Sequence, residues 1–457
     1  MRRVLAIAAI AIRSAVRSRI VILLLAILLL AIVGLPLTVK DDGTLAGHVQ
    51  LLIGYALGLA SLILALATVW AGCAAVSVEI QNRQIHLVVT KPVHRIQIWL
   101  GKWLGLLVVN AVLLGVCGVI VYGLLRWSTR AAALSPADRE ALREEILTAR
   151  RNVKPVPVSV DEAARQGFEK ARDQHLLPAD VPASEAYQAI RQSLLTRAFS
   201  VPPGGKREWI FSVPEGAGRG PPLLFRYRFS SSEIGLERVT GLWRVGRRDS
   251  PTRFEYTAET VPGVIRSFKV PASAVPGSGS LVVEYANVNE SPVTVLFAPD
   301  DGLQLLLSET SFEANFVRAL LVVFAQLAFI AALGVTAGSL FSMPVASFVS
   351  FCLLLIIQMS GYVQSMAAQE PAFTWRGGVG ETPAFWHAFS QAFFRVMNTI
   401  VSPLQGPNPL DLLAGGEFIT WPWLAHALLV KALLYGGCLG LVGWWILNRR
   451  EIALPSS

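Results

Sequence analysis

The stretch that decides the fold is 319–369, ALLVVFAQLAFIAALGVTAGSLFSMPVASFVSFCLLLIIQMSGYVQSMAAQ, which carries no charged side chain. A helix needs about 20 apolar residues to cross the roughly 30 Å hydrocarbon core of a bilayer, so this stretch is too long for one crossing. Pro344 disfavours helix at the residue before it. We therefore predict two spans, 316–340 and 345–367, joined by a tight turn.

Other apolar runs predict four further spans, at 20–39, 50–78, 103–126 and 421–447. Of the 457 residues, 53% are hydrophobic and only 16% are charged, and the mean hydropathy is +0.52. Soluble domains carry about 25% charged residues. The composition therefore excludes a soluble enzyme and predicts an α-helical polytopic membrane protein with six transmembrane helices. Residues 1–19 alternate basic and apolar positions, which is typical of an amphipathic helix at the membrane surface.

The charges are divided unevenly along the chain. Residues 128–315 hold 23 basic and 23 acidic side chains, so the net charge of +9 belongs to the membrane portions. A nucleic-acid-binding protein would carry a basic stripe on its soluble part, and none is present. Basic residues cluster at 1–19, 79–102 and 449–450, which the positive-inside rule places in the cytoplasm. We therefore predict a protein of the cell (inner or plasma) membrane, with both termini and the tail 451–457 cytoplasmic and 128–315 extracytoplasmic.

The extracytoplasmic insertion is predicted to be an α+β domain in two parts. Helix-start signals at Ser135, Ser159 and Ser184 predict a helical part over 128–205. Short alternating or β-branched runs separated by turn residues predict a β-sandwich or jelly roll over 206–315. The predicted strands are 208–213, 223–229, 239–245, 253–258, 264–270, 281–288 and 293–297.

Sequence patterns for catalysis or cofactor binding are missing. A P-loop needs Gly-Lys followed by Ser or Thr, whereas Gly101-Lys102 and Gly205-Lys206 are followed by Trp and Arg. The four cysteines all fall in apolar spans, which excludes a disulfide framework or a CxxC metal pair in the insertion. We expect no catalytic residue, no metal and no cofactor bound by this chain.

Two basic residues lie in apolar surroundings. Lys431 is near the middle of the last span, where a lysine costs about 2.5–3.5 kcal/mol on insertion scales. It should face the bundle or a wet cavity, or extend outward to the surface, so it has either a structural role or a place in a translocation path. Arg395, among the aromatic residues of 384–401, is either a headgroup anchor or a substrate contact.

Three segments together resemble a known family. The segment 79–102 is EIQNRQIHLVVTKPVHRIQIWLGK, with Glu79, Thr90, Pro92, Arg95 and Gly101-Lys102 in the order seen between the second and third spans of type 2 ABC exporter permeases. The final WWILNRREIA resembles the end of the same family, and 403–418 (PLQGPNPLDLLAGGEF) is similar to the outer loop of the nitrous-oxide-reductase-maturation type. The resemblance covers both membrane portions, and the large insertion 128–315 departs from it.

The resemblance implies a permease subunit driven by a separate ABC ATPase that binds ATP-Mg. The short helix of the 79–102 loop would be the coupling helix that docks on this ATPase, and 370–420 would be an outer re-entrant region. The expected partners are the ATPase, a second copy of the chain or a homologous permease, and the lipid bilayer, without nucleic acid. The implied ATPase-coupling residues are Glu79, Arg83, Gln84, His86, Pro92 and Arg95.

An alternative function is a membrane-anchored receptor or assembly scaffold whose outer β-sandwich binds a carbohydrate or protein ligand. Strand aromatics at alternate positions form either a core or such a binding face. The candidates for that face are Trp209, Phe225, Tyr227, Trp243, Phe254, Tyr256 and Tyr285.

Overall fold

The structure, a computed structural model, divides into two compact units. It describes residues 2–38, 52–82, 93–131, 147–157, 159–174, 176, 183–214, 222–233, 238–247, 253–275, 279–289, 292–299, 301–359 and 384–449. The first, termed the helical unit, comprises Met1–Leu147, Ser311–Ala368 and Trp375–Ser457. The second, termed the β unit, comprises Thr148–Thr310 with Gln369–Thr374.

Among its described residues, the helical unit contains four helices that are long and apolar enough to cross a membrane, which indicates a membrane protein. They are Leu52–Gln81 (π-helical η1, Leu52–Ala56, and α4, Leu57–Gln81), Arg95–Trp127 (most of α6, Arg95–Ala131), Phe312–Leu340 (α10) and Trp421–Arg449 (α15, Trp421–His426; π-helical η5, Ala427–Tyr435; α16, Gly436–Arg449). The other elements are α1 (Arg2–Arg17), α2 (Arg19–Thr38), α11 (Met343–Gln358), α13 (Ala384–Val401), the 3₁₀ turn η4 (Ser402–Leu404) and α14 (Pro409–Ala414).

These helices agree with four of the six predicted spans. The predicted first and fifth spans coincide with α2 and α11, which are shorter apolar helices, so the count of six stays a prediction. The predicted turn is confirmed: α10 ends at Leu340, and α11 begins at Met343 with Pro344 in its first turn, where no backbone N–H is needed. At its other end α10 is capped by the Ser311 hydroxyl, which accepts a hydrogen bond from the Ala314 N–H.

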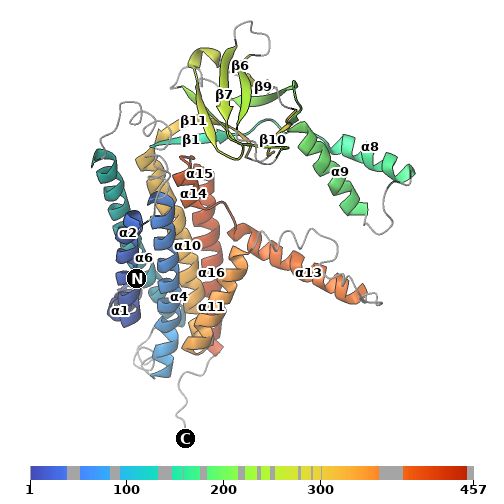
Figure 1. The fold of residues 1–457 in the computed structure, drawn as a ribbon. Helices are drawn as coiled ribbons and strands as arrows, with labels where there is room; N and C mark the ends of the chain where they lie inside the picture. The colour runs from blue at the N-terminus through green and yellow to red at the C-terminus, as the bar shows by residue number, and fades with distance from the viewer. Residues whose placement is uncertain are drawn as a thin grey trace. The chain divides into compact units, whose positions relative to one another are not determined.

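Helix α10 lies at the centre of the helical unit and contacts α4, α6 and α16 (Figure 1). Its closest neighbour is α4. A Cβ added to Gly72 would lie 3.1 Å from the Cα of Gly334, and one added to Gly338 would lie 2.4 Å from the Cys73 carbonyl oxygen. Small residues let helix backbones approach closely, and dispersion contacts then drive association within a membrane. These glycines therefore join the part of the chain before the β unit to the part after it.

The amphipathic helix α1 is present as predicted, and it packs along α6. Ile7, Ala8, Ala11 and Ala15 form its buried face. A Cβ added to Gly105 of α6 would lie 2.7 Å from the Ala8 carbonyl oxygen, so the two helices touch through their backbones. Arg2, Arg3, Arg13 and Arg17 stay exposed on the remaining face.

In the residues that the structure describes, the β unit contains three antiparallel sheets and a helical hairpin, α8 (Asp161–Asp173) and α9 (Ala183–Ala198). The sheet orders are β1-β11-β4-β8, β2-β10-β5 and β3-β9-β6-β7. The strands are β1 (Thr148–Val153), β2 (Ser200–Val201), β3 (Lys206–Val213), β4 (Leu223–Tyr227), β5 (Phe229–Ser231), β6 (Val239–Gly246), β7 (Phe254–Thr260), β8 (Arg266–Val270), β9 (Gly279–Asn287), β10 (Val295–Phe297) and β11 (Leu303–Ser311). The finer assignment as a jelly roll stays a prediction.

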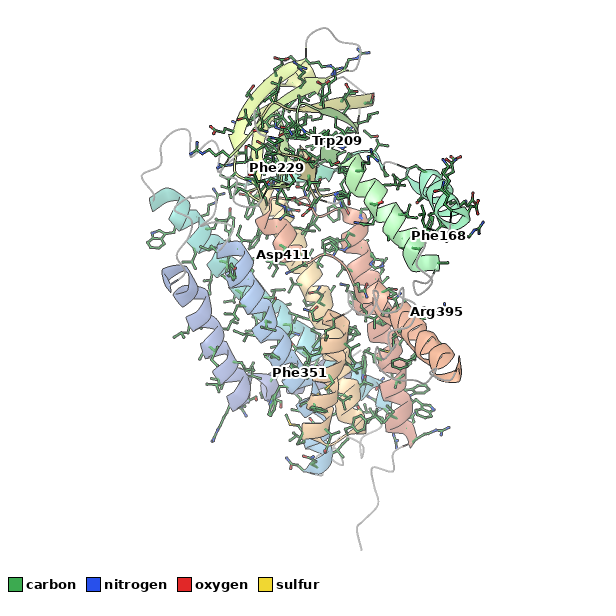
Figure 2. The ribbon with its side chains drawn as sticks, turned by 45° about the vertical axis from the view of Figure 1, so that its right-hand side comes forward. Phe168, Trp209, Phe229, Phe351, Arg395 and Asp411 are labelled. Carbon is green, nitrogen blue, oxygen red and sulfur yellow. The ribbon has the colours of Figure 1, made fainter. Side chains whose placement is uncertain are left out.

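All three sheets contribute to one aromatic core. Trp243 of β6 packs against Phe225 of β4 in a tilted contact, with ring centroids 5.2 Å apart, and against Phe297 of β10 edge to face at 5.7 Å. Figure 2 shows Trp209 and Phe229 among these side chains. Burying large aromatic rings supplies most of the hydrophobic stabilisation of such a small unit.

The strand predictions are confirmed except in three places. The range 223–229 forms two strands, β4 and β5, in different sheets. The range 128–205 is not wholly helical as predicted, because it contains β1 and β2. Strand β1 (TARRNV) has few apolar residues, and it lies at the edge of its sheet with Ala149 and Arg150 buried and Arg151 exposed. Strand β11 was not among the predicted strands, and the helix predicted from Ser135 lies outside the described residues.

Candidate functional site

The candidate site lies at one end of the helical unit, where α4 ends and α6 begins; we term it the basic end. Glu79 and Lys102 form an ion pair there, with Lys102 Nζ 2.6 Å from Glu79 Oε1. The Lys102 side chain is 4% exposed and that of Glu79 22%. Lys102 Nζ also donates to the Ala75 carbonyl oxygen. Helices α4 and α6 are thus tied together by a charged, largely dehydrated contact.

Helix α1 covers this ion pair. A cavity of about 40 Å³, large enough for a water molecule, is bounded by Ser14 and Ser18 near α1, by Ala71 of α4, and by Glu79 and Lys102. Ser14 and Ser18 belong to the N-terminal segment. A displacement of α1 would therefore open this cavity and let water reach the ion pair.

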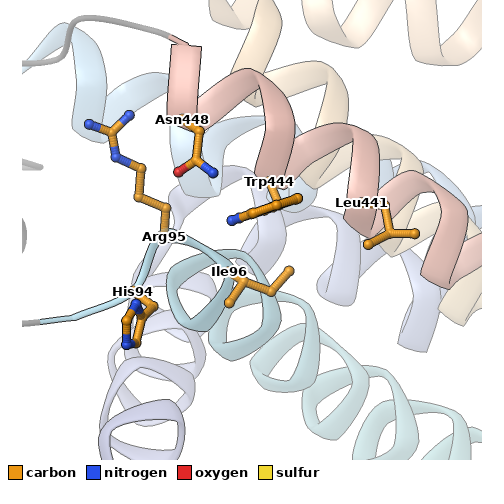
Figure 3. Close-up of a pocket in the computed structure, with 6 residues that line it drawn as sticks. All are labelled: His94, Arg95, Ile96, Leu441, Trp444 and Asn448. Atoms are coloured by element: carbon orange, nitrogen blue, oxygen red, sulfur yellow. The ribbon is translucent and has the colours of Figure 1, made fainter.

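Arg95 forms a second tie at the basic end. It begins α6, and its guanidinium donates a hydrogen bond to the Leu447 carbonyl oxygen near the end of α16. Between the two helices lies a cleft of about 450 Å³ (Figure 3). It is lined by His94, Arg95, Ile96, Leu441, Trp444 and Asn448.

The structure therefore brings two of the six predicted coupling residues, Glu79 and Arg95, to the same end of the helical unit. Glu79 joins α4 to α6, and Arg95 joins α6 to α16. Arg83, Gln84, His86 and Pro92 lie outside the described residues. The ends that flank them, Asn82 at the end of α4 and Arg95 at the start of α6, are described, so both anchor points of the 83–92 segment are known.

Lys431 and Arg395 do not belong to this site. Lys431 lies in the π-helical segment η5 and is 4% exposed, so it is buried within the bundle and does not extend outward. Arg395 is exposed on α13 (Figure 2), and α13 is tied to η5 by the Tyr435 hydroxyl, which donates to the Ile400 carbonyl oxygen at 2.7 Å. The structure thus places Lys431 inside the bundle, and its role, structural or in a translocation path, stays a prediction, as does the role of Arg395.

Two tryptophans near the basic end are functional candidates that sequence reasoning missed. Trp99 Nε1 donates to the Thr336 hydroxyl at 3.1 Å, and this hydroxyl donates to the Leu439 carbonyl oxygen at 3.0 Å. One chain of hydrogen bonds therefore links α6, α10 and α16. Trp103 stacks on Trp99 and donates to the Ala328 carbonyl oxygen at 2.9 Å. The signal in the sequence was a pair of tryptophans at i and i+4 beside Gly101-Lys102.

A polar clamp lies at the opposite end of α10. The buried Asn315 side chain donates to the Glu417 carbonyl oxygen and accepts from the Ile419 N–H, both at 2.8 Å. Arg318, one turn further along α10, lies over the rings of Phe418 and Trp421, which stabilises its charge by cation–π contact. The loop 415–420 is thereby fixed to α10. An asparagine and an arginine at the start of an apolar span are the sequence signal for this clamp.

The aromatic candidates of the β unit are mostly buried. Trp209, Phe225, Tyr227, Trp243 and Tyr285 are at most 3% exposed, whereas Phe254 and Tyr256 are half-buried. Burial raises the pKa of Tyr285 and of Tyr227 above that of a free tyrosine. Five of the seven rings therefore form the core and offer no face for stacking on a ligand.

No family model, curated protein or solved structure matches the chain. Among the described residues, no three His, Cys, Asp or Glu side chains lie close enough to hold a metal ion. The groups at the basic end are ion pairs and hydrogen bonds between helices. This arrangement is suited to passing a displacement from one helix to the next.

Proposed function

We propose that the chain is the membrane permease subunit of an ABC exporter, worked by a separate ATPase subunit through the segment between α4 and α6. In this proposal the basic end is cytoplasmic and the β unit is extracytoplasmic. ATP-Mg is bound by the ATPase, and a second copy or a homologous permease supplies the other half of the transporter. The β unit accepts cargo or docks a partner.

The observation that carries the proposal is the set of ties around the 83–92 segment. Its two anchors, the end of α4 and the start of α6, are joined by the Glu79–Lys102 pair, and Arg95 adds α16 through Leu447. A force on the segment therefore moves three helices together. If the two anchors were not joined, the same force would deform the segment without moving the helices.

The long helices carry this displacement across the membrane. The helix Leu52–Gln81 has 30 residues, or about 45 Å at 1.5 Å per residue. Its backbone contact with α10 at Gly72 and Gly334 leaves no side chains between the two helices to absorb movement. A tilt at the basic end is thus transmitted to α10 and, through the Asn315 clamp, to the loop 415–420.

A photo-crosslinking experiment tests the proposal. A photoreactive phenylalanine analogue is introduced at Gln84, in the centre of the proposed coupling segment, and at Ser230, an exposed residue of the β unit, as the control. After irradiation of intact cells, the adducts are identified by mass spectrometry. We expect a P-loop ATPase at Gln84 and none at Ser230. Labelling of a Gln84→Cys variant from the extracellular side by a membrane-impermeant maleimide would contradict the proposal.

The alternative, a receptor or scaffold, is not favoured by a specific observation, since most of the aromatic side chains that would form its ligand face are buried. The same experiment distinguishes it, because a receptor with this fold has no reason to hold an ATPase at Gln84.

A further inference from the structure

The cleft between α6 and α16 is amphipathic along its length. Leu441, Trp444 and Asn448 follow one another at i, i+3 and i+7, so they share one face of α16, with Ile96 opposite them (Figure 3). The two apolar members of this row lie deeper in the span, and Asn448 lies at its end. The row covers about 10 Å along the helix axis at 1.5 Å per residue.

The polar end of the cleft is positively charged. The hydrogen bond from Arg95 to Leu447 fixes a guanidinium beside Asn448. His94 lies next to it. Among the described residues, no acidic side chain lines the cleft. An anion at this end is therefore attracted by fixed charge and can accept hydrogen bonds from the Asn448 amide.

We propose that this cleft binds one anionic phospholipid of the leaflet at the basic end. The phosphate lies between Arg95 and Asn448, and the first part of one acyl chain lies against Ile96, Leu441 and Trp444. Basic pockets between membrane helices recognise lipid headgroups by this combination of charge and apolar surface. A soluble phosphate would make no use of the apolar row.

The lipid would act on the tie between α6 and α16. Its phosphate shares Arg95 with the Leu447 carbonyl oxygen, so an occupied cleft holds the start of α6 against the end of α16. The inference does not depend on the ATPase, because it needs only that the two helices span a bilayer.

The test uses the purified full-length chain in nanodiscs of phosphatidylcholine that contain a trace of photoactivatable phosphatidylglycerol, with the adducts mapped by mass spectrometry. We expect adducts on Ile96 and Trp444. The variant Asn448→Ala, and separately Trp444→Ala, should reduce them about tenfold, the change that corresponds to loss of one good contact. Trp445→Ala is the matched control: it is on the same helix, is 51% exposed against 39% for Trp444, and does not line the cleft.

Three outcomes would overturn the inference. Equal loss of adducts in Trp444→Ala and Trp445→Ala would mean that lipid coats the helix without a site. Equal labelling by a phosphatidylcholine probe would mean that the cleft holds acyl chains without reading charge. Protection by glycerol phosphate as effective as protection by unlabelled phosphatidylglycerol would make it a site for a soluble phosphate.

Discussion

The ion pair at the basic end gives an asymmetric prediction. Lys102 is almost fully buried, whereas Glu79 keeps about a fifth of its side chain exposed. Removing one partner of a buried pair costs about 3–5 kcal/mol, because the other charge is left dehydrated. The variant Glu79→Gln leaves the buried lysine unpaired, so we expect a cost near the lower bound, about 3 kcal/mol.

The reverse variant should cost less. Lys102→Met leaves Glu79, which water still reaches, so we expect about 1–2 kcal/mol, between the values for exposed and buried pairs. The double variant should cost no more than Lys102→Met alone, because it strands no charge. The costs of the two single substitutions in stability are therefore strongly non-additive, as expected for two residues in direct contact.

Hydrogen exchange of the full-length protein measures these effects locally. At 1.4 kcal/mol per factor of ten, protection of the amides of 98–106 should fall about 100-fold in Glu79→Gln and about tenfold in Lys102→Met. The control is Glu313→Gln, which breaks the Arg126–Glu313 pair, whose two side chains are both 51% exposed. It should change the protection of neighbouring amides less than about fivefold. Equal effects of the two single variants, or an additive double variant, would refute the reasoning.

Three further predictions concern other contacts. Gly338→Ala should lower the thermal stability of the full chain, because its Cβ would lie 2.4 Å from a carbonyl oxygen of α4, whereas Gly437→Ala, with nothing within 4 Å, should not. Asn315→Ala removes two buried hydrogen bonds at a cost of about 2–4 kcal/mol, which should expose the loop 415–420 to proteolysis; unchanged cleavage would contradict the clamp. Burial raises the pKa of Tyr285 in the folded β unit. The folding stability of the β unit should therefore be complete below a pH of about 10 and decrease as the pH rises further. In an absorbance titration this tyrosine should ionise after the exposed ones, and a single step near pH 10 would contradict its burial.

Periodicity and length were sufficient for the elements that bury a whole face. Helix α10 is found from an uncharged run alone, and β3 from its alternation, in which every second residue is buried. Strand β1 was missed because its register is set by pairing with β11, which follows it by 150 residues in the sequence. Such pairing is a tertiary effect, and local propensity carries no trace of it.

Residues of the site could be predicted from the sequence, but the contacts between them could not. The sequence picks out Glu79 and Lys102 as members of one motif, yet their spacing of 23 residues says nothing of contact. Contact arises because α4 and α6 run side by side, where the Thr68 hydroxyl of α4 also donates a hydrogen bond to the Asn110 side chain of α6. Asn315 was overlooked for a related reason: its partners are backbone groups of a loop about a hundred residues away.

The glycine contact between α4 and α10 has a consequence for biosynthesis. Gly334 is made 262 residues after Gly72, with Thr148–Thr310 of the β unit in between. At about 5–20 residues per second, α4 waits roughly 13–50 s in the bilayer before the helix it fits has left the ribosome. During that interval the glycine face of α4 is open to any other nearby helix with small residues. Nascent chains halted within the insertion should therefore be bound by the insertion machinery or removed by membrane proteases.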